Sequence, residues 1–235
     1  MTWEPGARST GIETMIAGFH RAVLLQCRTS QVTRSAGAAS RAGCGLVVTA
    51  ERGNLRACLA RARHLLEVDH YRGPVLLDAA RYAGEARLTA SAPFDRRWIE
   101  SQRQLGLPVL TDSGYLAPGD AAGLVSVLER AARLGDAIAL LAVHPHWLVD
   151  RYGRQTLVRY VSAVGVPVAV VLEAQPDDPV DGAAAITGLL HLIDCDVPVL
   201  LLRTGLSALG AVCSGAAAGA VGIEPALRRI PPTGA

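Results

Sequence analysis

The stretch Gly73-Pro74-Val75-Leu76-Leu77-Asp78 decides the fold, because the same phrase returns along the chain. In each copy Pro precedes a run of aliphatic residues that ends at a polar side chain. A run that is apolar at every position is typical of a strand covered on both faces. Proline is tolerated at a strand entrance, where no ladder donor is needed. The copies begin at Pro74, Pro108, Pro167 and Pro198. A series of buried parallel strands is therefore predicted.

The copies start about thirty residues apart, the length of one strand, one helix and two loops. A further apolar unit, 137–143, lacks Pro and ends at His144. Between the units, apolar residues recur at three- and four-residue spacings, as in amphipathic helices. The expected strands are 46–50, 74–78, 108–112, 137–143, 167–173, 198–203 and 216–222, with 22–26 as a candidate eighth. The expected helices are 54–66, 121–134, 148–164, 181–193 and 207–214.

Eight such strands would close a TIM-type (β/α) barrel, whereas five or six around a switch point would give an open, doubly wound parallel sheet. No Gly-rich dinucleotide fingerprint follows the first strand, so we favour the barrel, incomplete or irregular if the eighth strand is absent. The stretch Ser30 to Gly43 has no periodic apolar face. We therefore expect a flexible extension over residues 1–43, the barrel over 44–230 and a frayed end over 231–235.

Composition limits the function classes. Half of the 235 residues are hydrophobic, only 4% are aromatic, and the net charge of +2 does not predict a polyanion partner. All 23 basic residues are Arg. The five cysteines are scattered without a CxxC pair, which favours reduced, mostly buried thiols. We see no secretory signal and no apolar run of about 20 residues. We therefore expect a cytoplasmic protein that does not bind membranes.

In parallel α/β folds, ligands bind beyond the carboxyl ends of the strands. Reading those positions from the sequence gives a ring of polar residues. The ring comprises Asp78, Arg81, Tyr82, Asp112, Ser113, Tyr115, His144, His146, Glu173, Gln175, Arg203 and Ser207. Carboxylates, imidazoles and Arg that converge at one mouth indicate a ligand. The alternative is that Asp78 and Asp112 only cap turns and pair with Arg81 or Arg203.

Two further patterns suggest ligands at this edge. His144-Pro145-His146 could place two imidazoles on one side of a divalent metal, although few other ligands are on offer. The alternative is that His144 bonds within the mouth while His146 starts the next helix, and we expect no cofactor. Gly222 leads towards a short helical turn that contains Arg228. This is where many TIM barrels bind phosphate, so Gly222 and Arg228 are candidate phosphate ligands.

Leu110-Thr111-Asp112-Ser113-Gly114 resembles the LTDSG segment of tRNA-guanine transglycosylases, which continues as GGFQ in that family and as Tyr115-Leu116 here. The resemblance covers about five residues and the barrel plan. It implies that Asp112 belongs to a base-binding catalytic centre, with Ser113 and Gly114 as its supporting turn. The family's second catalytic Asp with its Pro-Thr-Arg segment and its Cys-rich zinc subdomain are missing.

Three functional hypotheses follow. The leading one is a transglycosylase-like enzyme that binds a nucleobase, nucleoside or nucleic-acid end, with base exchange altered or lost. Asp112 would be its nucleophile or general acid–base and Asp78 the carboxylate partner. Arg203 would anchor a phosphate or carbonyl oxygen, and Ser113, Gly114, Tyr115, Arg81, His144 and Glu173 would contact the ligand. The second is a metal-dependent hydrolase at His144 and His146. The third is a non-catalytic partner or scaffold protein. The sequence leaves open whether a partner subunit supplies the missing elements. It also leaves the oligomeric state open.

Overall fold

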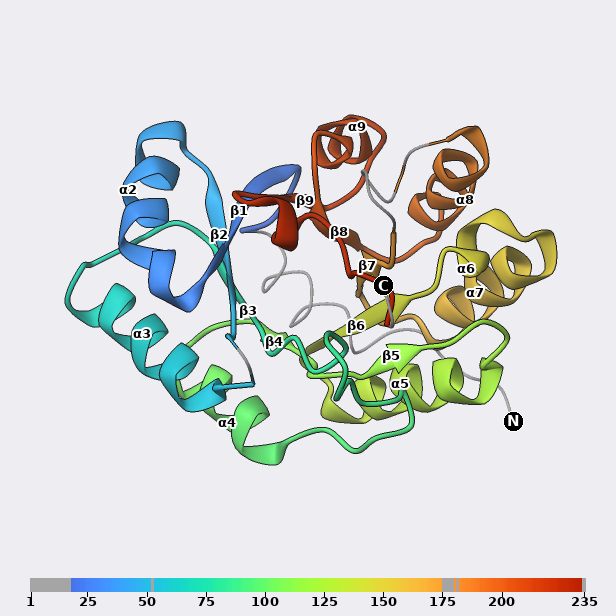
Figure 1. Ribbon diagram of the computed structural model, residues 1–235, viewed down its shortest axis with the longest axis horizontal. Helices are drawn as coiled ribbons and strands as arrows, with labels where there is room; N and C mark the ends of the chain where they lie inside the picture. Colours follow the sequence, from blue (N-terminus) through green and yellow to red (C-terminus); the bar gives the residue numbers. More distant parts are fainter. Residues whose placement is uncertain (1–17, 52, 175–179, 181, 234–235) are drawn as a thin grey trace.

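The strands form one parallel sheet that curls into a barrel, and helices cover its outside (Figure 1). The structure is a computed structural model that describes residues 18–233 except residues 52, 175–179 and 181. The strands are β1 (Ala22–Arg28), β2 (Gly45–Thr49), β3 (Val75–Asp78), β4 (Val109–Leu110), β5 (Tyr115–Leu116), β6 (Ala137–Val143), β7 (Val168–Leu172), β8 (Val199–Thr204) and β9 (Ala218–Gly222). The helices are α2 (Val32–Ala42), α3 (Leu55–Glu67), α4 (Arg96–Gln104), α5 (Ala121–Leu134), α6 (His146–Val149), α7 (Arg151–Val164), α8 (Ala183–Ile193) and α9 (Ser207–Cys213), with 3-10 turns η1 (Thr29–Gln31) and η2 (Pro225–Leu227).

The order of the strands confirms the TIM-type fold. The ladder runs β3-β2-β1-β9-β8-β7-β6-β4, and β5 pairs with β6 beyond β4. The first strand, β1, lies between β2 and the last strand, β9. An open doubly wound sheet would instead leave its last strand at an edge, unpaired with the first strand. β4 and β5 together occupy the position of one barrel strand, interrupted by residues 111–114.

The barrel is incomplete at the seam between β3 and β4. Over the described residues no ladder joins these two strands. The side chain of Gln102, which comes from α4, takes the place of a neighbouring strand. Its Nε2 donates to the carbonyl oxygen of Leu110 at 3.1 Å, and its Oε1 accepts from the backbone N–H of Leu110 at 3.1 Å. The N–H and the carbonyl oxygen of Leu110, at the edge of β4, are thereby both hydrogen-bonded inside the protein.

Small and branched residues fill the barrel interior, as the low aromatic content requires. The inner cluster stacks residues from every part of the wall, including Val47, Leu76, Ile138, Val171 and Leu200. Phe19 and Tyr82 add aromatic volume to the same cluster. Two further clusters pack the outer faces of the strands against the helices. The strands are therefore buried on both faces, which explains their continuous apolar runs.

The structure begins the barrel earlier than the boundary expected at residue 44. β1 and α2 form a complete first strand–helix unit within the stretch that we expected to be an extension. The inner face of α2 consists of Val32, Ser35, Ala36 and Ala39, whose small side chains give a weak periodic signal. None of the helices in the described ranges is long and apolar enough to cross a membrane.

Candidate functional site

A cavity of about 640 Å³ opens at the carboxyl ends of the strands, where a ligand would bind in this fold. Arg28, Thr49 and Arg203 come from the ends of β1, β2 and β8. The loop between β3 and α4 supplies another wall, and η2 closes one side. The lining also includes Ala50, Glu51, Gly53, Leu55, Ala80, Arg81, Ala83, Gly84, Glu85, Ala86, Leu88, Ala226 and Leu227.

Asp78 lies below this cavity at the end of β3, fully buried. Its Oδ2 accepts hydrogen bonds from Gln26 Nε2 at 3.1 Å, Thr49 Oγ1 at 3.2 Å and the Tyr82 hydroxyl at 2.7 Å. Its Oδ1 accepts from the backbone N–H of Ala80 at 2.8 Å. Burial is the main cause that raises the pKa of Tyr82 well above its usual value, so the phenol stays a donor. These four hydrogen bonds occupy the carboxylate.

Arg203 neutralises the charge of Asp78. Its Nε lies 3.6 Å from Oδ2 of Asp78, and both side chains are almost fully buried. The guanidinium carbon also lies 5.3 Å from the centre of the Tyr82 ring. Asp78 and Arg203 thus form an ion pair, which is the arrangement expected under the alternative that Asp78 caps a turn and pairs with an arginine.

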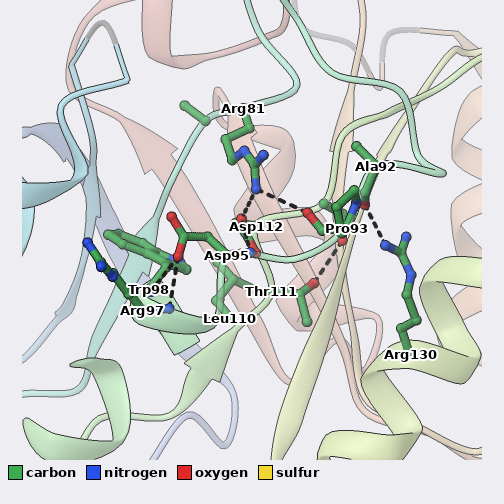
Figure 2. Close-up of polar contacts among 12 residues, drawn as sticks. Arg81, Ala92, Pro93, Asp95, Arg97, Trp98, Leu110, Thr111, Asp112 and Arg130 are labelled. Carbon is green, nitrogen blue, oxygen red and sulfur yellow. Dashed lines mark hydrogen bonds and ion pairs between the residues drawn. The ribbon is translucent and has the colours of Figure 1, made fainter. Parts of the chain in front are cut away.

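Asp112 is held in a second, separate network (Figure 2). Its side chain has no exposed area and pairs with Arg81. The backbone N–H of Asp95 donates to both carboxylate oxygens, at 2.9 and 3.2 Å. Arg81 also donates to the carbonyl oxygen of Pro93 at 3.3 Å, so the pair fixes the path of the loop before α4. Asp112 is absent from the cavity lining, and its contacts connect it to the loop before α4.

The neighbours of Asp112 in the LTDSG segment have structural partners too. Thr111 Oγ1 accepts from the backbone N–H of Leu140 at 2.9 Å and lies 2.8 Å from the Ser113 hydroxyl. A Cβ at Gly114 would lie 2.2 Å from the carbonyl oxygen of Thr89. Only Gly therefore allows the loop between β3 and α4 to pack on this segment.

Glu173 anchors a third cluster across the mouth. Its Oε1 accepts from Arg87 Nη1 at 2.8 Å, and its Oε2 accepts from the Tyr115 hydroxyl. The guanidinium carbon of Arg87 stacks 3.6 Å from the centre of the Tyr115 ring. Burial first, and the bond to Glu173 next, raise the pKa of Tyr115 above its usual range. Arg87 thus ties the β3–α4 loop to the far side of the barrel.

The two histidines face different carboxylates. His144 Nε2 lies 4.0 Å from Glu173, whereas His146 Nε2 lies 3.7 Å from Asp150. Nδ1 of His144 accepts from the backbone N–H of His146 at 3.1 Å, which leaves its proton on Nε2. Burial lowers the pKa of His144. Over the described residues, no group of three or more His, Cys, Asp or Glu side chains is placed to hold a metal ion. This geometry does not support the hydrolase alternative.

Gly222 and Arg228, the candidate phosphate ligands, contact each other. Arg228 Nε donates to the carbonyl oxygen of Gly222 at 3.0 Å and closes η2 onto β9. A Cβ at Gly222 would lie 2.3 Å from the carbonyl oxygen of Leu227, which accounts for the glycine. Of the remaining ring positions, Ser207 begins α9 and His146 begins α6, while Gln175 lies outside the described residues.

Sequence reasoning missed four residues of the mouth. Gln26 and Arg28 belong to β1. The sequence predicted this strand only as a candidate, within the expected extension. Arg28 lines the cavity and pairs with Glu224. Thr49 ends β2, and Glu51 follows it; both line the cavity. The rule that polar residues follow strands would have found Thr49 and Glu51 had it been applied to the second strand.

No model of a known protein family matches this sequence, and neither does any curated protein. Among solved structures, the tetrameric deoxyribose phosphate aldolase from Aeropyrum pernix aligns with 92% of this chain and 94% of its own, at 14% identity and a TM-score of 0.50. The TTHB071 protein from Thermus thermophilus, soaked with ZnCl₂, aligns with 76% of this chain and 65% of its own, at 16% identity and a TM-score of 0.31. The aldolase supports the TIM-type fold alone. The resemblance to tRNA-guanine transglycosylases stays confined to residues 110–114.

Proposed function

We propose that this protein is an enzyme that acts on a ligand of nucleoside or sugar size bound in the mouth cavity. The observation that carries the proposal is the cavity itself, which lies at the ligand-binding edge of the fold and collects polar residues from several strand ends. Its volume of about 640 Å³ falls within the usual range of small-molecule sites. The ligand class agrees with the nucleobase or nucleoside hypothesis drawn from the sequence.

The carboxylates in the cavity lining are Glu51 and Glu85. We assign proton transfer to Glu51, because it is half-buried and held in place by two donors. The Ser30 hydroxyl donates to its Oε1 at 2.5 Å and the Ser30 backbone N–H at 3.4 Å. A positioned carboxylate of this kind is a common general acid–base. Asp78 and Asp112, by contrast, are already enclosed by donors, so they would position the mouth and its loop.

The reaction proposed is transfer or hydrolysis by acid–base catalysis. The aldolase that shares the fold is named for deoxyribose phosphate, a ligand that suits the cavity in size. A Schiff base with a carbonyl substrate needs a lysine amine, however, and no lysine occurs among the 235 residues. Lysine-based carbonyl chemistry therefore does not follow from the shared fold.

Ligand binding and turnover test the proposal together. Wild-type protein is screened by calorimetry against nucleosides, sugars and their phosphates. Ala83→Trp fills the cavity and should abolish binding of any hit, whereas Ala60→Trp, exposed on α3, should not. Glu51→Gln should keep binding and lower turnover by about 100-fold or more. Binding that survives Ala83→Trp unchanged, or the absence of any hit, would contradict the proposal.

A non-catalytic partner protein is the second candidate. It predicts mouth carboxylates that are already neutralised, and Asp78 and Asp112 are indeed paired with Arg203 and Arg81. It also predicts exposed apolar residues; Leu206 and Tyr152 are 76% and 75% exposed. Ligand binding without turnover, unaffected by Glu51→Gln, would favour this candidate.

A further inference from the structure

A second cavity adjoins the mouth cavity beside the end of β1. Its volume is about 660 Å³, and its lining comprises residues 28–31, Glu51, Asn54, Ala57 and Glu224. Arg28 and Glu51 line both cavities. The two cavities are therefore neighbours, and these two side chains lie at the boundary between them.

Side-chain hydrogen bonds hold the walls of the second cavity in place. Thr29 Oγ1 donates to the carbonyl oxygen of Thr49 at 3.2 Å, which ties η1 to the end of β2. Gln31 Nε2 donates to Glu224 at 3.0 Å, and Arg28 pairs with the same carboxylate. These two contacts tie β1 and η1 to the start of η2. The turn η1 is thus fixed on two sides, which gives the second cavity a defined shape.

The two cavities differ in the chemistry of their walls. In the second cavity, Ala57 is the one apolar residue of the lining. The lining of the mouth cavity, by contrast, includes Leu55, Ala83, Leu88 and Leu227. A flat organic ring suits the apolar groups of the mouth cavity, whereas hydroxyl groups suit the polar wall of the second.

The charges of both walls disfavour an anion. Every arginine that lines them already pairs with a carboxylate, in the pairs Arg28–Glu224, Arg81–Asp112 and Arg203–Asp78. Among the described residues, Glu51 and Glu85 also line the mouth cavity but have no cationic partner. The charges left without a partner are therefore negative, so an occupant that donates hydrogen bonds is favoured over an anion.

The hydrogen-bonding groups at the boundary suit hydroxyl groups. Glu51 Oε1 accepts from the Ser30 hydroxyl at 2.5 Å, while Oε2 has no hydrogen-bond partner among the described residues. Asn54 Oδ1 accepts from the backbone N–H of Ala57 at 3.0 Å, and in the described part of the chain its Nδ2 has no acceptor. A sugar hydroxyl both donates and accepts, so sugar hydroxyls can satisfy both groups.

On the basis of the proposed function, we infer that the second cavity is a sugar subsite and that the substrate is an uncharged glycoside spanning both cavities. The sugar occupies the second cavity, and the ring to which it is linked occupies the mouth cavity. Because Glu51 lies at the boundary, the glycosidic bond lies beside the carboxylate to which proton transfer is assigned.

Ligand pairs test the subsite by calorimetry on the wild-type chain. Adenine is compared with adenosine, and phenol with phenyl β-glucoside, so each pair differs by one sugar. In at least one pair the sugar-bearing member should bind more tightly by about tenfold or more. Adenosine 5′-monophosphate should bind no more tightly than adenosine, because the wall arginines are already paired.

The outcomes separate the subsite from the proposed function. If no member of either pair binds, the proposed function fails and the subsite fails with it. If the ring alone binds as tightly as the sugar-bearing member, the mouth cavity binds ligands but the sugar subsite is overturned. Tighter binding of adenosine 5′-monophosphate than of adenosine would overturn the uncharged substrate class.

Variants then place the sugar in the second cavity. Ala57 is exposed on α3 and lines the second cavity but not the mouth cavity, so Ala57→Trp fills the second cavity alone. It should weaken the sugar-bearing ligand to the affinity of the ring alone, about tenfold, and leave binding of the ring unchanged. Ala57→Leu replaces it if the Trp variant does not fold.

Ala60→Trp is the matched control, because Ala60 is exposed on the same helix and lines neither cavity. It should bind both members of each pair as the wild type does. Equal affinity of Ala57→Trp and Ala60→Trp for the sugar-bearing ligand would overturn the inference.

Discussion

The carboxylate of Asp112 follows β4 and is held in place by backbone and ion-pair contacts. It accepts two hydrogen bonds from the backbone N–H of Asp95 and pairs with Arg81. Asp95 in turn caps α4, because its Oδ1 accepts from the backbone N–H groups of Arg97 and Trp98. Asp112, which follows β4, thus connects the end of that strand to the start of α4. Removing it should loosen the loop that forms a wall of the mouth.

We predict that Asp112→Ala lowers the free energy of unfolding by about 2 kcal/mol. The variant leaves the Asp95 N–H without its acceptor, while Arg81, whose side chain is 24% exposed, recovers part of its solvation. Urea denaturation measures the loss, with Asp196→Ala on an exposed loop as control. An Asp112→Asn variant with wild-type stability and ligand affinity but no turnover would contradict the structural role and restore the catalytic one.

The sequence predicted which residues reach the mouth better than what they do there. Asp78, Glu173 and Arg203 follow buried apolar runs, so the strand-end rule found them. The pairing of Asp78 with Arg203 was one of the alternatives drawn from the sequence. The partner of Glu173 was out of reach, because Arg87 lies in the long β3–α4 loop, which has no periodic pattern. Pairing depends on how that loop crosses the barrel, and this is a tertiary property.

At the scale of elements, the interrupted strand β4–β5 is the irregular part of the barrel. The apolar run near residues 108–112 predicted one continuous strand, but the ladder stops after Leu110 and resumes at Tyr115. The helix α4 compensates through Gln102, and the loop before it pairs with Tyr115 through backbone hydrogen bonds to Leu88 and Ala90. A buried Gln within a polar helix carries no signal that would predict this role. The irregular seam therefore could not be derived from periodicity.

Gln102→Leu should destabilise the protein by about 2–4 kcal/mol. The leucine keeps the apolar volume but leaves the N–H and the carbonyl of Leu110 without partners in a buried position, each worth about 1–3 kcal/mol. Thermal or urea denaturation measures the change, and hydrogen exchange at the Leu110 amide reports it locally. Gln104→Leu, exposed on the same helix, should stay within about 0.5 kcal/mol of wild type. Equal effects of the two variants would remove the assigned role of Gln102.

At the scale of the molecule, the continuity of the sheet between its N-terminal and C-terminal strands depends on β1. β1 is hydrogen-bonded to β2 on one side and to β9 on the other, so it pairs the first part of the sheet with the last strand. The stretch that follows it, α2, is rich in Ala, Ser and Gly, and this composition made it resemble an extension. A helix whose buried face is built from small residues satisfies packing against the barrel without a strong apolar pattern. Composition alone therefore misplaces the start of the barrel, whereas strand pairing settles it.

Cysteine protection tests whether this first unit unfolds with the rest. Cys27 in β1 and Cys58 in α3 are buried, whereas Cys44 and Cys195 are half-buried and Cys213 is exposed. Burial raises the pKa of Cys27 to about 11 and that of Cys58 to about 12. At pH 8, a thiol reagent should label three cysteines in the native protein and all five in denaturant. Cys27 should react only as fast as Cys58, at the rate of global unfolding; labelling of Cys27 as fast as Cys213 would show a separately mobile first unit.

The same two buried thiols predict how stability depends on pH. Above pH 9 the unfolded chain releases the thiol protons of Cys27 and Cys58 while the folded chain keeps them, so the free energy of unfolding should fall from pH 9 towards pH 11. A Cys27→Ala, Cys58→Ala double variant should lose that part of the pH dependence, which ties the protection of both thiols to one cooperative barrel.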